Sequence, residues 1–418
     1  MKVTILGAAR EVGRSAILVD CDGTRLLLDY GVLLKREPLF PMHVKPRDID
    51  AVLITHAHLD HSGFVPSLFL SGSTNVYATE PTLELSRLLI EDMLKISGFY
   101  MPFEYLELLT MLKYSKPIDY RVSIPIKDVE ARLYESGHVL GGSTIVVEYN
   151  NKRIFYTGDI NTKGTRVLRG ADLDIGDIDL VITESTYSME EHQPREEAEE
   201  GLIEFANDVI ERGGVLFIPA FSVERAQEIA CVFQYHNFRY RIVMDGMALK
   251  ANEIMLKYPK FMRDAELFRR AINNADWIRG WSERKKAIKE PCVVISPAGM
   301  LVGGASIFYL EQLANDTKNG IAVVSYQGEG TPGRALIDER VAIIKGKIRK
   351  VNAEIRQFDF SGHSGRHELF DMLKGIKGNP KVLTIHGDGD ACIKFAEEIR
   401  SIIGLEAHAP VTGESIEI

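Results

Sequence analysis

The segment AVLITHAHLDHSG, residues 51–63, joins a run of apolar residues to three histidines and an aspartate within six positions. The apolar run is typical of a buried strand. The polar residues that follow it are His56, His58, Asp60 and His61. Packing these groups together costs desolvation and charge repulsion unless a cation collects them. Because imidazole and carboxylate groups are ligands of zinc, the segment predicts a metal site.

The same segment also has the pattern of a helix start, because HLDHSGFVPSLFL follows the strand-like run. Helix N-capping by Asp60 or Ser62 is therefore the structural alternative to metal binding for those two residues. With side chains that alternate along an extended chain, His56 and His58 can reach one ion. Asp60 and His61, at the turn into the helix, can then face a second ion.

Several other apolar runs also lead to a residue that can bind a metal or transfer a proton. These residues are Asp29, His138, Asp159, Glu184, His363 and His386. A lone residue of this kind after a strand is usually a turn residue, and for Asp29 a structural role and a functional role stay equally open. Strand ends can present side chains to a common edge of a sheet, so the repetition favours one shared site.

Composition places broad limits on the chain. Its 418 residues suggest two or three domains, and 45% hydrophobic and 26% charged residues are ordinary for a globular protein. No apolar run approaches the roughly 20 residues that span a membrane. The four cysteines are far apart, which argues against a disulfide framework and favours the reducing cytoplasm. A net charge of −9 means that binding of nucleic acid would require local positive charge or bound cations.

The pattern of elements changes along the chain. Strand-like runs dominate the first part, with a helical insertion at about residues 82–113. From about residue 195, strands and helices alternate, which predicts a mostly parallel α/β sheet. Strand-like runs return from about residue 351. We therefore predict a β-rich domain in two parts, 1–189 and 351–418, and an inserted α/β domain at 190–350.

Four motifs carry a resemblance to a known family. THAHLDH, with the later His138 and Asp159, resembles the HxHxDH signature of the metallo-β-lactamase superfamily. TEST, FSGHSG and TIHGD resemble motifs A, B and C of its β-CASP branch, which contains ribonuclease J and the archaeal homologues of the cleavage and polyadenylation specificity factor endonuclease. The resemblance implies an αββα sandwich with an inserted α/β domain. One departure is Glu224, which stands where the family commonly has glycine.

The resemblance also implies roles for the individual residues. A first zinc ion would be held by His56, His58, His138 and Asp159, and a second by Asp60, His61, Asp159 and His386. Asp29 would orient a ligand, and Asp60 would also accept a proton from the nucleophile. His363 would protonate the leaving ribose oxygen, with Glu184 orienting it. Candidate substrate-binding residues are Arg225, Arg334, Ser361 and Ser364, each with a structural hydrogen bond or a solvated side chain as the alternative.

The predicted activity is that of a ribonuclease that uses two zinc ions and cuts single-stranded RNA in RNA processing, such as mRNA 3′-end formation, or in decay. We expect endonuclease activity, with 5′-to-3′ exonuclease activity as a possible addition. The expected setting is the cytoplasm, without a membrane, as a homodimer with a possible RNA-processing or exosome-type complex as partner. The alternatives are a small-molecule metallo-hydrolase, which would not need the insertion, and a non-catalytic RNA-binding scaffold, although every ligand position is filled.

Overall fold

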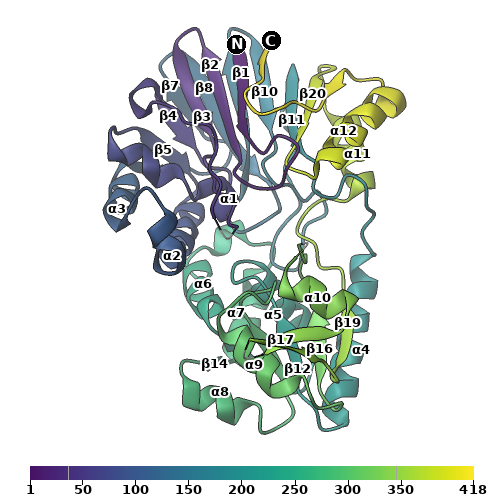
Figure 1. Cartoon of the computed structure of the whole chain (residues 1–418). Helices are drawn as coiled ribbons and strands as arrows, with labels where there is room; N and C mark the ends of the chain where they lie inside the picture. The colour runs from purple at the N-terminus through teal and green to yellow at the C-terminus, as the bar shows by residue number, and fades with distance from the viewer. Residues whose placement is uncertain (36, 329, 345) are drawn as a thin grey trace. The chain divides into compact units, whose positions relative to one another are not determined.

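The computed structural model describes residues 1–35, 37–328, 330–344 and 346–418. The described chain divides into two compact units (Figure 1). The first unit consists of Met1–Gly164, Arg169–Glu191 and His363–Ile418, and the second of Thr165–Leu168 and His192–Gly362.

The first unit contains two seven-stranded sheets among the described residues. In spatial order, the first sheet consists of β22 (Ser415–Glu417), β1 (Lys2–Gly7), β2 (Ala16–Cys21), β3 (Thr24–Leu28), β4 (Ala51–Leu53), β5 (Asn75–Ala78) and β6 (Ser115–Pro117). The second consists of β21 (Ala407–His408), β20 (Lys381–Ile385), β11 (Leu180–Glu184), β10 (Lys152–Tyr156), β9 (Ser143–Tyr149), β8 (Val129–Glu135) and β7 (Ser123–Ile126).

The two sheets face each other across a buried apolar core. Their inner faces contribute, among others, Leu26, Leu28 and Leu53 from the first sheet and Ile145, Val147 and Ile182 from the second. Such residues alternate along the strands with others that face outward, as expected for packed sheets.

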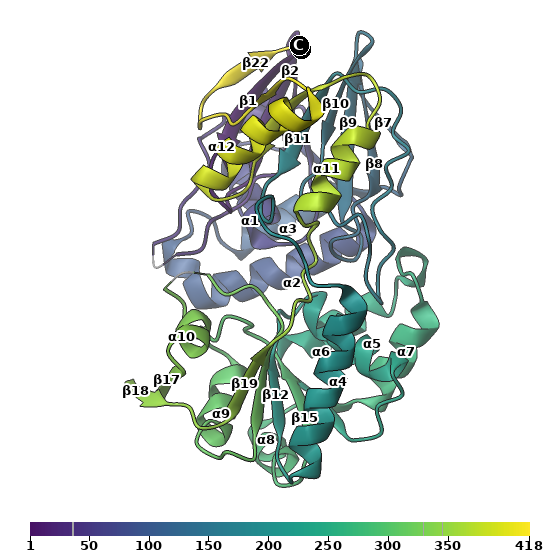
Figure 2. The ribbon, with the colours of Figure 1, turned by 90° about the vertical axis from the view of Figure 1, so that its right-hand side faces the viewer.

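Helices cover the outer face of each sheet (Figures 1 and 2). The α-helices of the first unit are α1 (Leu59–Ser62), α2 (Glu80–Ser97), α3 (Tyr105–Tyr114), α11 (Arg366–Gly375) and α12 (Gly389–Glu398), with the short 3₁₀ helices η1 (Pro46–Asp48), η2 (Val65–Leu70) and η3 (Gly98–Tyr100) and the π-helix η5 (Ile399–Ile403). Ile90 of α2 and Met111 of α3 pack in a cluster with Val52 of the first sheet. Phe395 of α12 packs with Phe155 of the second sheet. This layering confirms the predicted αββα sandwich.

Parallel pairing decides where the strand ends meet. β10, β11 and β20 are neighbours and run parallel, with Glu184 paired to Ile385 at the end of the ladder. Their carboxyl ends therefore lie at one edge of the second sheet, and Asp159 and His386 follow two of these strands. In the first sheet β3 and β4 are also parallel neighbours, so the residues that follow them leave from a common edge.

The second unit is built on a six-stranded parallel sheet, as the strand–helix alternation predicted. Among the described residues its order is β14 (Asp276–Ile278), β13 (Ile242–Asp245), β15 (Val293–Ser296), β12 (Leu216–Pro219), β16 (Gly320–Val323) and β19 (Glu354–Gln357). Its other elements are α4 (Arg195–Glu211), α5 (Arg225–Tyr235), α6 (Met247–Met255), η4 (Pro259–Phe261), α7 (Ala265–Asn274), α8 (Trp281–Ala287), α9 (Ala305–Leu313), α10 (Pro332–Asp338) and the hairpin β17 (Val341–Ile344) and β18 (Lys347–Lys350). The strand β19 follows residue 350, where we predicted a domain boundary. No helix in the described ranges is long and apolar enough to cross a membrane.

A buried ionic cluster fixes the short segment Thr165–Leu168 within the second unit. The guanidinium of Arg166 donates hydrogen bonds of 2.7 to 3.1 Å to the carboxylate of Glu199, which is fully buried. His236 Nε2 lies 2.8 Å from the same carboxylate. Removing one partner from such a cluster leaves a buried charge without compensation, so a single substitution here should lower the free energy of unfolding.

Glu224 adopts a backbone conformation that favours glycine. Its φ angle is +73°, and the amide of Arg225 donates a hydrogen bond of 3.0 Å to the carbonyl of Val223 across it. A tight turn of this kind is strained for a residue with a side chain. The backbone conformation of this turn therefore explains why the family commonly has glycine at this position.

Candidate metal centre

Residues 51–63, the segment rich in histidine, begin in β4, a strand of the first sheet that is buried on both faces. β4 lies between β3 and β5 and leads to His56, which is buried, and to α1. The N-cap residue of α1 is His58, without a capping hydrogen bond from its side chain, so neither Asp60 nor Ser62 is the N-cap. The hydroxyl of Ser62 instead donates to the carbonyl of Ala57 at 2.9 Å. The capping alternative is therefore wrong for both residues.

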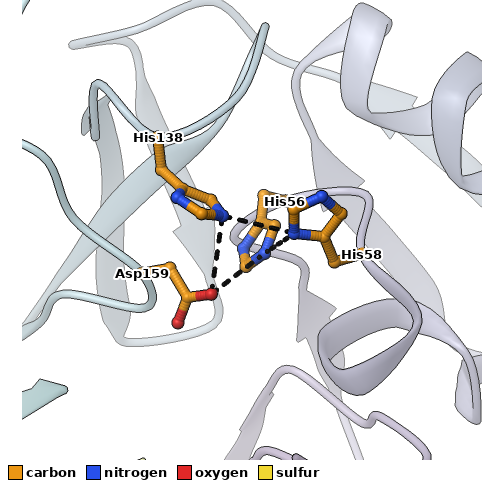
Figure 3. A group of neighbouring side chains, drawn as sticks. All are labelled: His56, His58, His138 and Asp159. Carbon is orange, nitrogen blue, oxygen red and sulfur yellow. Dashed lines mark hydrogen bonds and ion pairs between the residues drawn. The ribbon is translucent and has the colours of Figure 1, made fainter. Parts of the chain in front are cut away.

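A first group of donor atoms comes from His56, His58, His138 and Asp159 (Figure 3). His58 Nδ1 lies 3.2 Å from both His56 Nε2 and His138 Nε2. Asp159 Oδ2 lies 3.5 Å from each of the same two Nε2 atoms. Ligands at about 2.0–2.1 Å around a tetrahedral ion are about 3.3 Å apart. The donor atoms of this group therefore have the spacing and chemistry that zinc requires.

A second group shares Asp159 with the first and adds Asp60, His61 and His386. Asp159 Oδ1 lies 3.2 Å from His61 Nε2 and 3.2 Å from His386 Nδ1. Asp60 Oδ2 lies 3.3 Å from His386 Nε2 and 3.9 Å from His61 Nε2. One oxygen of Asp159 thus faces each group. Its Oδ1 is buried and accepts no hydrogen bond from the described residues, as expected for an atom that is available to a cation.

Two glycines allow the segments that carry these groups to approach closely. A Cβ atom at Gly158 would lie 2.8 Å from the side chain of Thr55, and the φ angle of Gly158 is +52°. A Cβ atom at Gly31 would lie 1.8 Å from the carbonyl oxygen of Asp60. Any larger residue at either position would separate the segments that hold the two groups.

Asp29 holds one imidazole of the second group in a defined orientation. Its Oδ2 lies 2.7 Å from His61 Nδ1, and it also accepts hydrogen bonds from Thr55 Oγ1 at 2.8 Å and from the Tyr156 hydroxyl at 2.9 Å. Asp29 is fully buried and has a φ angle of +57°. A carboxylate that accepts the Nδ1 proton leaves Nε2 with its lone pair toward Asp159. Asp29 was predicted from the sequence, whereas Thr55 and Tyr156 were not.

A third group joins His363 and Glu184 to Asp159. Glu184 Oε2 lies 2.9 Å from His363 Nδ1, and Glu184 Oε1 accepts a hydrogen bond of 2.7 Å from the amide of Ile160. The ring of His363 packs against that of His138 with centroids 4.4 Å apart. Glu184 is buried, whereas His363 keeps 19% of its side chain exposed, so a substrate can reach it. The ring of Tyr187, which was not predicted from the sequence, also lies near His363, with ring centroids 5.9 Å apart.

Burial and charge divide the histidines into two kinds. Burial lowers the pKa of His56 well below its ordinary value, and the charge of His61 adds to this effect. Burial also lowers the pKa of His58. Burial would lower the pKa of His61 too, but the carboxylates of Asp159 and Asp29 outweigh it and raise this pKa well above the ordinary value. The carboxylates around His61 thus favour positive charge at the position where a cation would lie.

Neighbouring histidines lower the pKa values of the two carboxylates, Asp159 and Asp60. Burial alone would raise the pKa of Asp159, but the charges of His386 and His61 outweigh burial and hold it well below the usual range. The pKa of Asp60 is likewise lowered, because the hydrogen bond with His386 and the charge of His61 outweigh burial. Both side chains are therefore carboxylates, the form that binds metal.

The candidate substrate residues separate into two sets. Ser364 is buried in the first unit, where its Oγ accepts a hydrogen bond of 3.0 Å from the amide of Thr162. Ser361, Arg225 and Arg334 belong to the second unit. Arg334 pairs with Asp338 one helical turn away at 2.6 Å, which is the structural role that sequence analysis gave as its alternative.

Comparison with known proteins agrees with this arrangement. Three family models match the chain: a metallo-beta-lactamase superfamily domain at residues 18–185, a Beta-Casp domain at 226–336 and a Zn-dependent metallo-hydrolase RNA specificity domain at 348–410. A solved structure titled as a protein of unknown function from Enterococcus faecalis V583 matches with a TM-score of 0.66 and 15% identity over 99% of both chains, which shows the fold alone.

Relatives with higher identity extend over the whole chain. RNase aCSPSF2 of Saccharolobus solfataricus is 36% identical over 99% of this chain and 85% of its own length. The probable RNase MJ4 of Methanocaldococcus jannaschii is 36% identical over 100% of both chains. Transcription termination factor FttA of the same organism is 35% identical over 100% of this chain and 72% of its own length. With this coverage, and with its fold and donor groups in place, the chain belongs to the β-CASP branch of the metallo-β-lactamase superfamily.

Proposed function

We propose that the chain is a zinc-dependent ribonuclease that hydrolyses phosphodiester bonds of single-stranded RNA with two metal ions. The observation that carries the proposal is the pair of donor groups that share Asp159, one on each carboxylate oxygen. The alternatives lose support here, because two of the relatives are named as ribonucleases and one family model is described as an RNA specificity domain.

The residues present suit two zinc ions. His56, His58 and His138 with Asp159 would hold one ion, and Asp60, His61 and His386 with Asp159 would hold the other. When bound, zinc polarises a phosphoryl oxygen and lowers the pKa of water to about 7. Asp29 would keep Nε2 of His61 directed toward Asp159 through its 2.7 Å contact with Nδ1.

Two side chains would move protons. Asp60 keeps 29% of its side chain exposed, so it can accept a proton from the attacking water. His363 would protonate the 3′-oxygen of the leaving ribose, because an alkoxide is a poor leaving group. Burial lowers the pKa of His363, but the charges of Glu184 and Asp159 outweigh burial and raise it to about 9, so the ring carries a proton to donate. Glu184 would orient the ring of His363 through its contact with Nδ1. Products would carry a 5′-phosphate and a 3′-hydroxyl.

The remaining features of the proposal come from the resemblance. We propose endonuclease activity with 5′-to-3′ exonuclease activity in RNA processing or decay. Four buried free cysteines support a reducing, cytoplasmic setting. Homodimerisation, a processing or exosome-type partner, and RNA contacts by Arg225, Arg334, Ser361 and Ser364 stay predictions.

The decisive experiment follows matched RNA labelled at its 5′ or 3′ end. Internal products from both labels would support endonuclease activity, and early release of a labelled 5′ mononucleotide would support exonuclease activity. Single-stranded DNA of the same sequence competes at one stated salt concentration, because affinity depends on salt. No cleavage of RNA by the zinc-loaded protein, or equal cleavage of DNA, would contradict the ribonuclease proposal.

A further inference from the structure

A two-stranded hairpin of the second unit presents an unusual concentration of positive charge. β17 and β18 pair antiparallel around Gly346, which has a φ angle of +71° (Figure 2). Residues 339–350 contain five basic residues and one acidic residue, in a chain with 50 basic and 59 acidic residues. Residue 345 lies outside the described residues. We use the name basic hairpin for β17, β18 and the four described cations Arg340, Lys347, Arg349 and Lys350.

The base of the basic hairpin is fixed to the second unit. Ala342 of β17 is buried and belongs to the same apolar cluster as Leu336 of α10. The amide of Val351 donates a hydrogen bond of 2.8 Å to the carbonyl of Arg340, which closes the open end of the hairpin. The cations therefore extend from a backbone that is held in place, so a ligand would not bear the full cost of ordering a free loop.

All four cations are exposed, and none makes an ion pair with a described residue. Other arginines of the same unit do pair: Arg212 with Glu354, Arg241 with Asp276, and Arg334 with Asp338. Exposed cations that internal carboxylates do not neutralise are available to an external polyanion.

We propose that the basic hairpin binds the phosphate backbone of the RNA substrate. This inference rests on the proposed function and adds a contact outside the metal centre. The charge of the hairpin is complementary to RNA, and the family model described as an RNA specificity domain begins at residue 348, within β18. A local cationic site also answers how a chain with a net charge of −9 can hold a polyanion.

Two competing roles for the cations lead to different expectations. Lysines on an edge strand can prevent sheets from pairing edge to edge. Ile343 and Ile348 lie directly opposite each other and are exposed, so a second copy of the chain could also pair there. In either case, neutralising the cations would change the oligomeric state, not the affinity for RNA.

The test compares two triple variants with the same change in charge. One carries Lys347→Gln, Arg349→Gln and Lys350→Gln. The control carries Lys285→Gln, Lys286→Gln and Lys289→Gln, which are exposed residues in or near α8 of the same unit. Both are made in a His363→Ala background, which limits cleavage during the measurement. Fluorescence anisotropy then measures binding of a labelled single-stranded RNA across a salt series.

Removal of three phosphate contacts should reduce the slope of log K against log salt by about 2, at about 0.7 per contact with a single strand. At about 0.1 M salt this corresponds to about 100-fold weaker binding if all three contact phosphates. The control should retain the slope of the parent. Single variants, Arg349→Gln and Lys350→Gln, provide the same comparison if the triple variant unfolds.

Several outcomes would overturn the inference. Equal slopes for the hairpin variant and the control would do so, and would leave the proposed function intact if the wild-type protein still cleaves RNA. A changed oligomeric state with unchanged RNA affinity would assign the cations to edge protection or to a second copy. A wild-type protein that neither binds nor cleaves RNA would overturn the proposed function and this inference together.

Discussion

Glu184 provides a sharp test of how His363 works. Replacing Glu184 with glutamine keeps a side chain of the same shape, yet it removes the negative charge 2.9 Å from His363 Nδ1. Hydrogen bonds to charged groups contribute about 1.5–3 kcal/mol, and neutral ones about 0.5–1.5 kcal/mol. The difference of about 1–1.5 kcal/mol predicts that Glu184→Gln lowers kcat about tenfold.

The effects on kcat of substituting Glu184 and His363 should not be additive. His363→Ala removes the proton donor and should lower kcat by about 10²–10⁴-fold. If Glu184 acts only through His363, the double variant should be no slower than His363→Ala alone. Glu228→Gln is the matched control, because Glu228 is another buried carboxylate that accepts backbone amide hydrogen bonds, from Arg166 and Val167.

The assay is single-turnover cleavage of RNA at saturating protein, with metal content measured on the same preparations. A substrate with sulfur in place of the leaving 3′-oxygen adds a direct check, since a thiolate leaves without protonation. His363→Ala should cleave that substrate within a fewfold of the wild-type rate. A double variant a further tenfold slower than His363→Ala, or a sulfur substrate that gives no rescue, would refute the assignment.

Further predictions concern metal content and stability. His58→Ala should lose part of the bound zinc, whereas His363→Ala should keep all of it; elemental analysis decides, and loss of zinc from the second variant would make that histidine a ligand. Glu199→Gln leaves a partly buried guanidinium without its partner and should lower the free energy of unfolding by about 3 kcal/mol, whereas Glu266→Gln, at an exposed pair, should change it by less than about 1 kcal/mol in urea denaturation. Burial alone would raise the pKa of Asp359, but its hydrogen bond with His192 outweighs burial and lowers that pKa from 3.8 to about 2. Its stabilisation of about 2 kcal/mol is thus present above pH 3.8 and lost as the pH falls toward about 2, and Asp359→Asn should remove this pH dependence of unfolding.

Much of the site could be predicted because its residues follow strands. A buried strand that ends on histidine or carboxylate has a local signature, and parallel neighbours bring such ends together. His56, Asp159, Glu184 and His386 were identified in this way, and the structure brings them into connected groups. The local pattern already separated His56 and His58 from Asp60 and His61. The motif resemblance added to each group the ligands that lie far from this segment in the sequence, His138, Asp159 and His386.

What the sequence did not reveal depends on contacts between distant segments. Tyr156 reaches Asp29 across 127 positions, and nothing near it in the sequence distinguishes it from any other strand tyrosine. The capping alternative for Asp60 failed because His58 already occupies the N-cap position of α1. β19 continues the second unit beyond residue 350 because its partner is β16, a pairing that depends on the whole sheet.

The most direct test of the two-ion account is a zinc titration of metal-stripped protein in which bound zinc and the rate of RNA cleavage are measured on the same samples. Two donor groups that share Asp159 predict binding of two ions per chain, with most of the cleavage rate gained as the second ion binds. Saturation at one ion with full cleavage, or full cleavage by the metal-free protein, would contradict the account.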